Sequence, residues 1–239
     1  MELVELAVPV LLKGLWMTLI LTFVSVMIGF SLGLGLALMR RSSVAVISGA
    51  ARYYSVVMRG TPLMVQLFLI YYGLGQIHFV QKSNILWWVV GEGTHCAVLA
   101  LALNTAAYTS EILRGGFESL PPGLVEAAKA CGMSRLKRLQ RIEFPLAIRQ
   151  ALPAYGNEIV LQVKGTSLAS TITVLEITGY AKRLMSQTFA IFEVFTMAGI
   201  LYLAINLLLI GGVRILERRL MRHTAPISNA GSAIPEPTR

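Results

Sequence analysis

Charged side chains are scarce in this chain of 239 residues, of which only 14% are Asp, Glu, Lys or Arg. A soluble domain carries about 25% charged and about 45–50% apolar residues, whereas 55% of this chain is hydrophobic. A single core of this size cannot bury so much apolar surface. The composition therefore excludes a water-soluble enzyme and a disordered protein. It predicts a membrane protein with about five or six spanning helices of about 20 residues each.

Cysteine and the usual catalytic motifs are also nearly absent. The two cysteines, Cys96 and Cys131, lack the clustered spacing of a disulfide framework or a metal site. The sequence contains no glycine-rich nucleotide loop, its three histidines are isolated, and no Ser, His and Asp arrangement is evident. We therefore expect no catalytic residues, no bound metal and no cofactor in this chain.

Four stretches without a charged residue are long enough to cross a bilayer, and the distribution of Lys and Arg predicts a fifth span. The expected spans lie at about 14–39, 60–80, 94–113, 151–175 and 193–213. Segments 40–59 and 114–149 and the tail from Arg214 hold 16 of the 21 Lys and Arg residues, so they should be cytoplasmic. We therefore expect an all-α, multi-pass protein with its N-terminus outside and its C-terminus inside. The same bias explains the net charge of +9 without a nucleic-acid partner.

The two ends of the chain carry different signals. Glu2 and Glu5 stand where a secretory signal would be basic, so we expect the N-terminus to lead into an uncleaved first span. Within that span, Gly29 and Gly33 are spaced for the close approach of a second helix. Residues 223–239 are rich in Pro, Ser and Ala, which predicts a disordered cytoplasmic tail after a transmembrane domain of residues 1–222.

The cytoplasmic loop 114–150 has the pattern of a helix, a glycine turn and a second helix. Residues 124–131 favour a short helix, and Gly132 suits the residue that ends it. Ser134 is a suitable N-cap for a second helix that runs to about Arg141. Several apolar side chains occur in both helices, and apolar positions outside a bilayer need a partner surface. The loop is therefore predicted to dock on another protein.

Polar side chains inside two of the spans mark a candidate substrate site, because such groups are costly in a bilayer. They share one face of each helix: Tyr155, Glu158 and Gln162 on the fourth span, and Asn104, Tyr108 and Glu111 on the third. A shared polar cavity near the midplane could hold a polar amino acid, with a carboxylate against its amino or guanidinium group. A structural alternative stays open for Glu111, which could pair with Arg114, and for Asn104, which could hold two helices together.

The spacing within the loop resembles that of a known family. It follows the pattern E-A-A, three residues, G, nine residues, I-x-F-P, formed by Glu126, Ala127, Ala128, Gly132, Ile142, Phe144 and Pro145. This is similar to the signature loop of ABC importer permeases, in which leucine usually stands at the position of Phe144. Segments 59–63, 101–116 and 152–170 look like permeases of polar amino-acid importers, and most of all like the M-type permeases of histidine and opine (octopine, nopaline) systems.

The resemblance implies a type I ABC importer permease fold in a bacterial inner membrane. It implies a Q-type permease as partner in a heterodimer, a dimeric ABC ATPase that binds ATP and Mg²⁺, and a periplasmic substrate-binding protein. The residues expected to couple this chain to the ATPase are Glu126, Ala127, Ala128, Gly132, Ile142 and Pro145. The transported molecule would be a polar or basic amino acid or an opine, at a site in this subunit or in its partner. The alternative is a stand-alone secondary carrier or channel, which would leave the spacing of the loop unexplained.

Overall fold

The computed structural model describes residues 2–221, and every regular element in that range is helical. The longer helices are α1 (Glu2–Arg40), α2 (Ala45–Gly60), α6 (Gly93–Glu118), α9 (Phe144–Gly165), α10 (Ile177–Thr188) and α11 (Ile191–Met221). The short helices are α3 (Leu63–Phe68), α4 (His78–Lys82), α5 (Asn84–Val90), α7 (Pro122–Ala130) and α8 (Arg135–Arg138). Turns of π-helix form η1 (Leu69–Gly73) and η3 (Leu139–Glu143), and 3-10 turns form η2 (Leu74–Gln76) and η4 (Thr166–Ile172). The expected tail, 223–239, lies outside the described residues.

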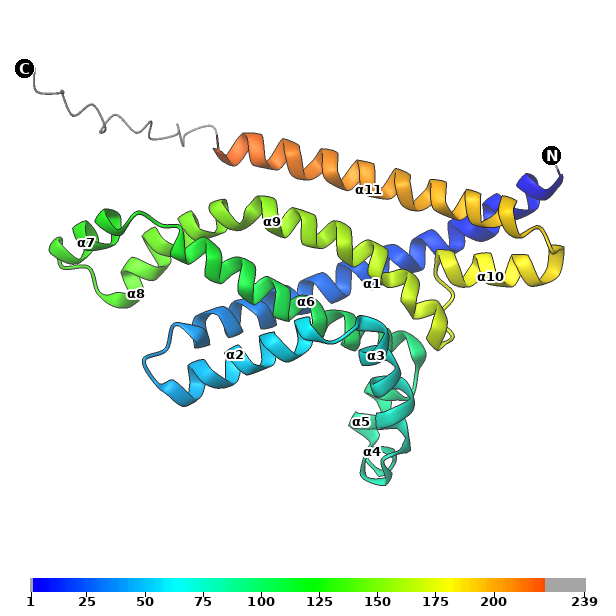
Figure 1. Ribbon diagram of the computed structural model, residues 1–239, viewed down its shortest axis with the longest axis horizontal. Coiled ribbons are helices and arrows are strands. Elements are labelled where there is room, and N and C mark those ends of the chain that lie inside the picture. The colour runs from blue at the N-terminus through cyan, green and yellow to red at the C-terminus, as the bar shows by residue number, and fades with distance from the viewer. Residues whose placement is uncertain (1, 222–239) are drawn as a thin grey trace, which may run out of the picture.

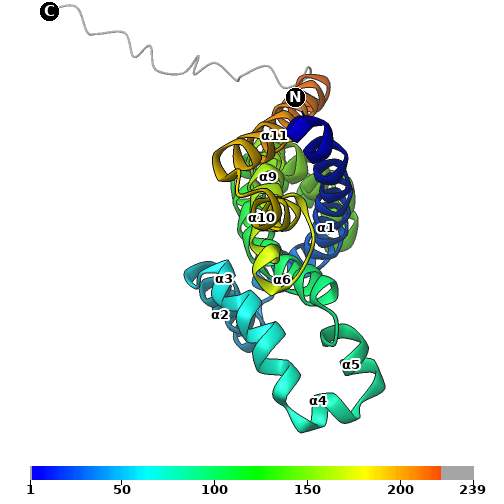
Figure 2. The same cartoon turned by 90° about the vertical axis from the view of Figure 1, so that its right-hand side faces the viewer.

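The bundle is built from α1, α6, α9 and α11, which extend along a similar direction (Figure 1). Helix α1 makes its most extensive contact with α6, which also packs on α9, and α9 in turn packs on α11. Helices α1, α6 and α11 run in one direction, and α9 runs in the opposite direction. Helices α7 and α8 lie at the end of the bundle where α6 finishes and α9 begins. Figure 2 shows that α4 and α5 project away from the bundle as an arm.

Among the described residues, three helices are long and apolar enough to cross a membrane: Leu3–Arg40, Gly93–Glu118 and Ile191–Leu220. A shorter apolar helical stretch covers Leu63–Gln76. Helix α9 coincides with most of the expected fourth span, but Glu158 and Lys164 make it less apolar. Several apolar helices are thus present, as the composition predicted.

The region of the expected second span differs in its local structure from a single helix at 60–80. Helix α2 begins at Ala45, within the basic segment expected to be cytoplasmic, and ends at Gly60. Thr61 is extended, because a residue before proline is pushed out of the helical region. Helix α2 buries Ser55, whose hydroxyl lies 2.8 Å from that of Ser110 on α6. Arginine favours a helix, and packing on α6 buries one face of this segment, so the segment is helical.

Glycines on α1 allow the close contact with α6. A Cβ atom on Gly33 would lie 2.6 Å from Thr109 Cβ and 2.9 Å from the Ala106 carbonyl oxygen. One turn earlier, a Cβ on Gly29 would overlap the side chain of Thr105. The prediction that Gly29 and Gly33 permit close helix approach is therefore confirmed.

Candidate functional site

Glu158 on α9 lies at the seam between α9 and α6. Its carboxylate accepts a hydrogen bond of 2.8 Å from the Thr105 hydroxyl, and only 6% of the residue is exposed. Within residues 2–221 no cationic side chain forms an ion pair with Glu158. Glu158 is thus a buried acid whose hydrogen-bond partner in this part of the chain is a neutral hydroxyl.

Gln162 and Tyr155 extend the same face of α9 toward α1. The Gln162 amide donates to the Ser25 hydroxyl at 2.9 Å and to the Leu101 carbonyl oxygen at 3.1 Å, which ties α9 to both α1 and α6. The ring of Tyr155 packs edge-on against Phe30 of α1, with ring centroids 5.3 Å apart. These residues therefore share a face with Glu158, and that face meets a seam between helices.

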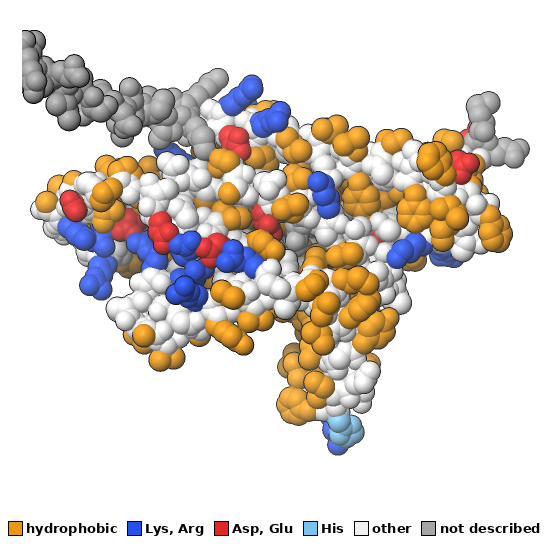
Figure 3. Space-filling view, in the orientation of Figure 1, with side chains coloured by type: hydrophobic (Ala, Val, Ile, Leu, Met, Phe, Trp, Pro, Cys, Tyr) orange, Lys and Arg blue, Asp and Glu red, His pale blue; other side chains and the backbone are white. Residues whose placement is uncertain are grey.

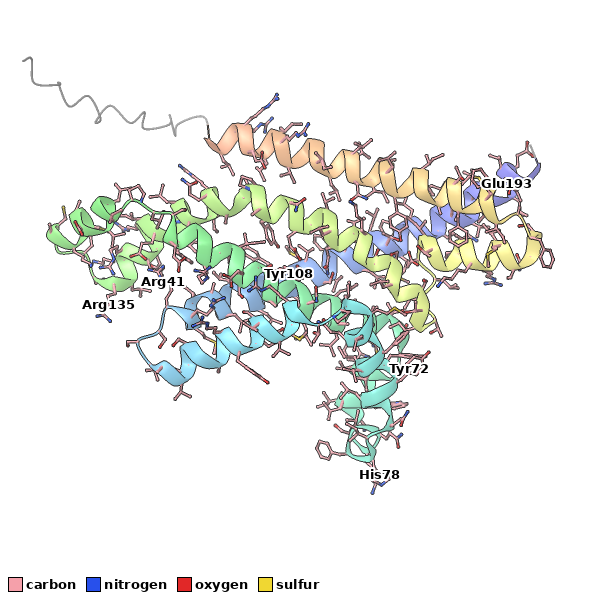
Figure 4. The ribbon with its side chains drawn as sticks, in the orientation of Figure 1. Arg41, Tyr72, His78, Tyr108, Arg135 and Glu193 are labelled. Atoms are coloured by element: carbon pink, nitrogen blue, oxygen red, sulfur yellow. The ribbon has the colours of Figure 1, made fainter. Side chains whose placement is uncertain are left out.

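Asn104 on α6 points to a different neighbour. Its side-chain amide donates to Gln66 Oε1 at 3.0 Å and to the Met58 carbonyl oxygen at 3.3 Å, which joins α6 to α2 and α3. The Gln66 amide in turn donates to the Met58 carbonyl oxygen and to the Thr61 hydroxyl. The side-chain amides of Asn104 and Gln66 therefore have their hydrogen-bond partners on α2, on α3 and in the link between them. Asn104 therefore holds helices together. Tyr108, one turn further along α6, is half-buried near the middle of the molecule (Figure 4).

Glu111 occupies an ion-pair cluster near the end of α6. Its carboxylate accepts hydrogen bonds from Arg40 at the end of α1, from Arg59 of α2 at 3.3 Å and from Arg114 Nε at 2.7 Å. The structural alternative of pairing with Arg114 is thus present, together with two further arginines. The polar residues singled out in the sequence consequently lie in separate neighbourhoods: the α1–α6–α9 seam, the α2–α6 contact and this cluster.

A pocket of about 940 Å³ opens between the ends of α1, α2 and α6. Its charged lining consists of Arg40, Arg41, Arg52, Arg59, Arg114, Glu111 and Glu118. Figure 3 shows basic and acidic side chains gathered in a band over this end of the molecule. Arginines therefore outnumber carboxylates around this pocket, at the end of the bundle that also carries α7 and α8.

The loop forms the helix, turn and helix expected from the sequence. Helix α7 ends at Ala130, and Gly132 has a φ of +72°, a conformation that a residue with a Cβ adopts only at a cost. Ser134 caps α8 by accepting a hydrogen bond from the Lys137 amide. The second helix does not stop near Arg141, because a π-helical turn joins α8 directly to α9. Pro145 lies in the first turn of α9, directly after this π-helical turn.

The signature residues of the loop differ in exposure. On α7, Glu126 and Ala127 are exposed and Ala128 is buried; further on, Ile142 is half-buried and Pro145 is exposed. Leu124 is 46% exposed and Leu136 is 62% exposed, so apolar side chains of both short helices face outward. This outward apolar surface is available for the docking that the sequence predicts.

Glu143, which no sequence pattern singled out, is a buried charged side chain of the loop. It is 2% exposed and is paired with Arg138 Nε at 2.6 Å and with Arg41 beyond the end of α1. Burial by itself raises the pKa of the Glu143 carboxyl, but the bonds from Arg138 and Arg41 outweigh it and hold the pKa below its usual value. One feature of the sequence could have identified Glu143: it is an acid between the apolar residues Ile142 and Phe144, in a segment rich in arginine and lysine.

The remaining chemistry-bearing side chains form no metal site in the described part of the chain. Cys96 is buried at the start of α6, Cys131 is exposed after α7, and both are free thiols. No group of three or more His, Cys, Asp or Glu side chains within residues 2–221 is arranged to hold a metal ion.

Comparison with known proteins gives consistent matches over most of the chain. The model of the family described as "Binding-protein-dependent transport system inner membrane component" matches residues 26–222. The nopaline transport system permease protein NocM of Agrobacterium fabrum is 53% identical over 198 residues, which cover 83% of this chain and 82% of that protein. The histidine/lysine/arginine/ornithine transport system permease protein HisM of Escherichia coli is 41% identical over 215 residues, or 90% of each chain.

Solved structures show the same fold. A chain from the crystal structure of an amino acid ABC transporter with histidines superposes with a TM-score of 0.79 at 38% identity, covering 89% of this chain and 94% of that one. A chain of the MetNI methionine ABC transporter in an inward-facing conformation gives a TM-score of 0.72 at 18% identity, covering 88% of this chain and 96% of that one. The second likeness is one of fold alone.

Proposed function

We propose which helices of this chain cross the membrane, contact the ATPase and meet the substrate. The chain belongs to the family of binding-protein-dependent transport system inner membrane components. It is a permease subunit of an ABC importer for amino acids or opines in the inner membrane, and ATP is hydrolysed by a separate protein. The resemblance drawn from the signature loop is thereby confirmed, and the stand-alone carrier or channel is set aside. ABC permeases work with ATPase subunits and binding proteins, so this chain acts within a complex.

The proposed topology has five crossings, with the N-terminus periplasmic and the C-terminus cytoplasmic. The first crossing is α1, and the second is the apolar stretch Leu63–Gln76 of the expected span 60–80, which follows α2. The other three are α6, then α9 with η4, and finally α11. The opposite directions of α9 and its neighbours support this order (Figure 1). Arginines occur where α1 and α11 end and on α8, which is the pattern expected of a cytoplasmic side.

The proposed contact with the ATPase is the outward face of α7, near Glu126. This helix lies at the end of the bundle and exposes apolar side chains, and Gly132 fixes the turn that follows it. This loop is the observation that carries the proposal. Closure of an ATPase dimer that binds ATP and Mg²⁺ would displace α7, and the displacement would shift the bundle between two states. We propose a Q-type permease as the partner in the membrane and a periplasmic binding protein as the source of substrate.

The proposed substrate is a polar or basic amino acid or an opine, and Glu158 is the side chain in this subunit best suited to meet its cationic group. A carboxylate buried in a bilayer needs a compensating charge, and Glu158 has no ion-pair partner within the described residues. A substrate amino or guanidinium group would supply that charge when α9 and α6 separate. The further residues proposed to line or shape the path are Gln162, Tyr155, Asn104, Tyr108 and Glu111.

The coupling role is tested by a pair of glycine substitutions in the loop. A Cβ atom on Gly132 or on Gly115, near the end of α6, meets open space, but only Gly132 of the two has a positive φ. Gly132→Ala therefore strains the turn by about 1–2 kcal/mol, whereas Gly115→Ala leaves the backbone unstrained. We expect Gly132→Ala to lower ATP-driven uptake by the complete reconstituted complex while membrane insertion stays normal, and Gly115→Ala to leave uptake unchanged. Equal uptake by both variants would contradict a role for the turn in coupling.

A further inference from the structure

Glu143 is held at an unusual point of the backbone. It is the last residue of η3, the π-helical turn that links α8 to α9. Such a wide turn is rare in α-helices and frequently occurs at functional sites. The side chain of Glu143 is buried there, whereas its neighbours Ile142 and Phe144 are only half-buried.

Two arginines from different elements meet the Glu143 carboxylate. Arg138 on α8 donates from Nε to one carboxylate oxygen at 2.6 Å. Arg41, which directly follows α1, donates to the other oxygen from a position 102 residues away in the sequence. Figure 4 shows Arg41 at the end of the molecule that also carries Arg135 of α8. The carboxylate therefore joins the loop to the end of α1.

The same arginine also contacts the end of α6. The guanidinium carbon of Arg41 lies 4.4 Å from the centre of the Phe117 ring, in the geometry of a cation–π contact. Through Arg41, Glu143 is thus connected to α1 and to α6. Both carboxylate oxygens are engaged and the Glu143 side chain is buried, although 38% of the Arg41 side chain is exposed. The buried carboxylate makes this link firmer than a pair in which both side chains are exposed.

The order of the elements along the chain shows which helices the loop can move through the backbone. The loop with α7 and α8 follows α6 and runs on through η3 into α9, so a movement of α7 reaches α6 and α9 through the backbone. It does not reach α1 in that way, because α2 to α6 lie between α1 and the loop along the chain. Movement of α1 with the loop therefore depends on non-covalent contacts: the packing of α1 on α6 and α9 links it to the loop indirectly, and the Arg41–Glu143 pair links it directly.

Among the ion pairs of residues 2–221, Arg41–Glu143 alone joins the end of α1 to the loop. We propose that Glu143 is a positioning residue for coupling: it transmits displacement of the loop to α1, so that α1 and α6 move with α9. This inference rests on the proposed docking of α7 on the ATPase. Glu143 acts through Arg41 and Arg138 and has no role in holding substrate or nucleotide.

The test uses the complete complex, reconstituted in liposomes with its ATPase, partner permease and binding protein. Glu143→Gln keeps the shape of the side chain and removes its charge. Arg41→Gln removes the link to α1 while Glu143 keeps its pair with Arg138, so the buried carboxylate stays compensated. Glu118→Gln is the matched control, because Glu118 pairs with Arg114 at the surface, where 64% of the Glu118 side chain is exposed.

The amount of substrate imported per ATP hydrolysed separates coupling from stability. We expect Glu143→Gln and Arg41→Gln to assemble and to hydrolyse ATP without the binding protein at the normal rate, but to import at least about fivefold less substrate per ATP. Glu118→Gln should match the unmodified complex. Normal import per ATP by assembled Arg41→Gln would overturn the inference, even if Glu143→Gln lowered the yield of complex. Failure of the unmodified chain to assemble with an ATPase would instead refute the proposed function, and the inference would fall with it.

Discussion

The contact of α1 with α6 makes a prediction for Gly33 that can be worked from distances. Alanine at this position would place its Cβ 2.6 Å from Thr109 Cβ, whereas ordinary contact begins at 3.4 Å, so the helices must separate by about 0.8 Å. Overpacking of this kind costs about 1–3 kcal/mol. Alanine also gains about 0.5–1 kcal/mol of helix stability over glycine, so the net loss is up to about 2.5 kcal/mol. For a chain of this size, each kcal/mol lowers the melting temperature by about 2–4 °C, which gives a fall of up to about 10 °C.

Gly35→Ala is the matched control on the same helix. A Cβ atom on Gly35 meets no atom within 4 Å, and replacing a helical glycine by alanine otherwise stabilises by about 0.5–1 kcal/mol. We therefore expect thermal unfolding of the detergent-solubilised complex, followed by size-exclusion chromatography, to give a lower midpoint for Gly33→Ala. The midpoint for Gly35→Ala should equal or exceed that of the unmodified complex. Equal midpoints for the two variants would refute the close packing of α1 on α6.

Two further predictions concern the buried carboxylates of Glu158 and Glu143. We expect Glu158→Gln to weaken the uptake of cationic substrates by roughly tenfold to a hundredfold while the complex still assembles. The reason is that a hydrogen bond to a charged group contributes about 1.5–3 kcal/mol. Unchanged affinity and rate in transport assays would remove Glu158 from the substrate path. The pKa of Glu143 is lowered in the folded state, so its ion pairs stabilise the fold above the unfolded pKa of about 4.3 and are lost as pH falls through the lower folded value. The difference in melting temperature between the unmodified chain and Glu143→Gln should therefore stay constant between about pH 8 and about pH 5 and narrow below about pH 4. A difference that persists into stronger acid would contradict the conclusion that the ionised Glu143 carboxylate stabilises the fold.

Local signals in the sequence predicted local structure well. Gly132 was expected to end a short helix and Ser134 to cap the next, and both do so, because a positive φ and an N-cap depend on neighbouring backbone atoms. Helical spacing likewise grouped Tyr155, Glu158 and Gln162 on one face. These features need no knowledge of the rest of the fold.

Contacts between distant segments could not be predicted in the same way. Spacing assigned Asn104 to one face of its helix, but it could not say that this side chain meets α2 and α3 rather than α9. The pairing of Arg41 with Glu143 joins residues 102 positions apart, and no periodicity relates them. The helix from Ala45 was missed because its arginines resemble those of a cytoplasmic loop, whereas its small side chains pack on α6.

Polar contacts between helices are mostly neutral in the middle of the bundle and are ion pairs at the end that carries the loop. This difference affects which helices can move apart. In the α1–α6–α9 seam the partners are neutral hydroxyl, amide and carbonyl groups, apart from Glu158, and side-chain hydrogen bonds between membrane helices contribute only about 0.6 kcal/mol each. At the end that carries the loop, arginines and glutamates form linked ion pairs. Weak neutral bonds let helices shift relative to one another, whereas linked, partly buried ion pairs keep their partners together. The seam is therefore where we expect the helices to separate, and the loop end is where we expect them to move as one.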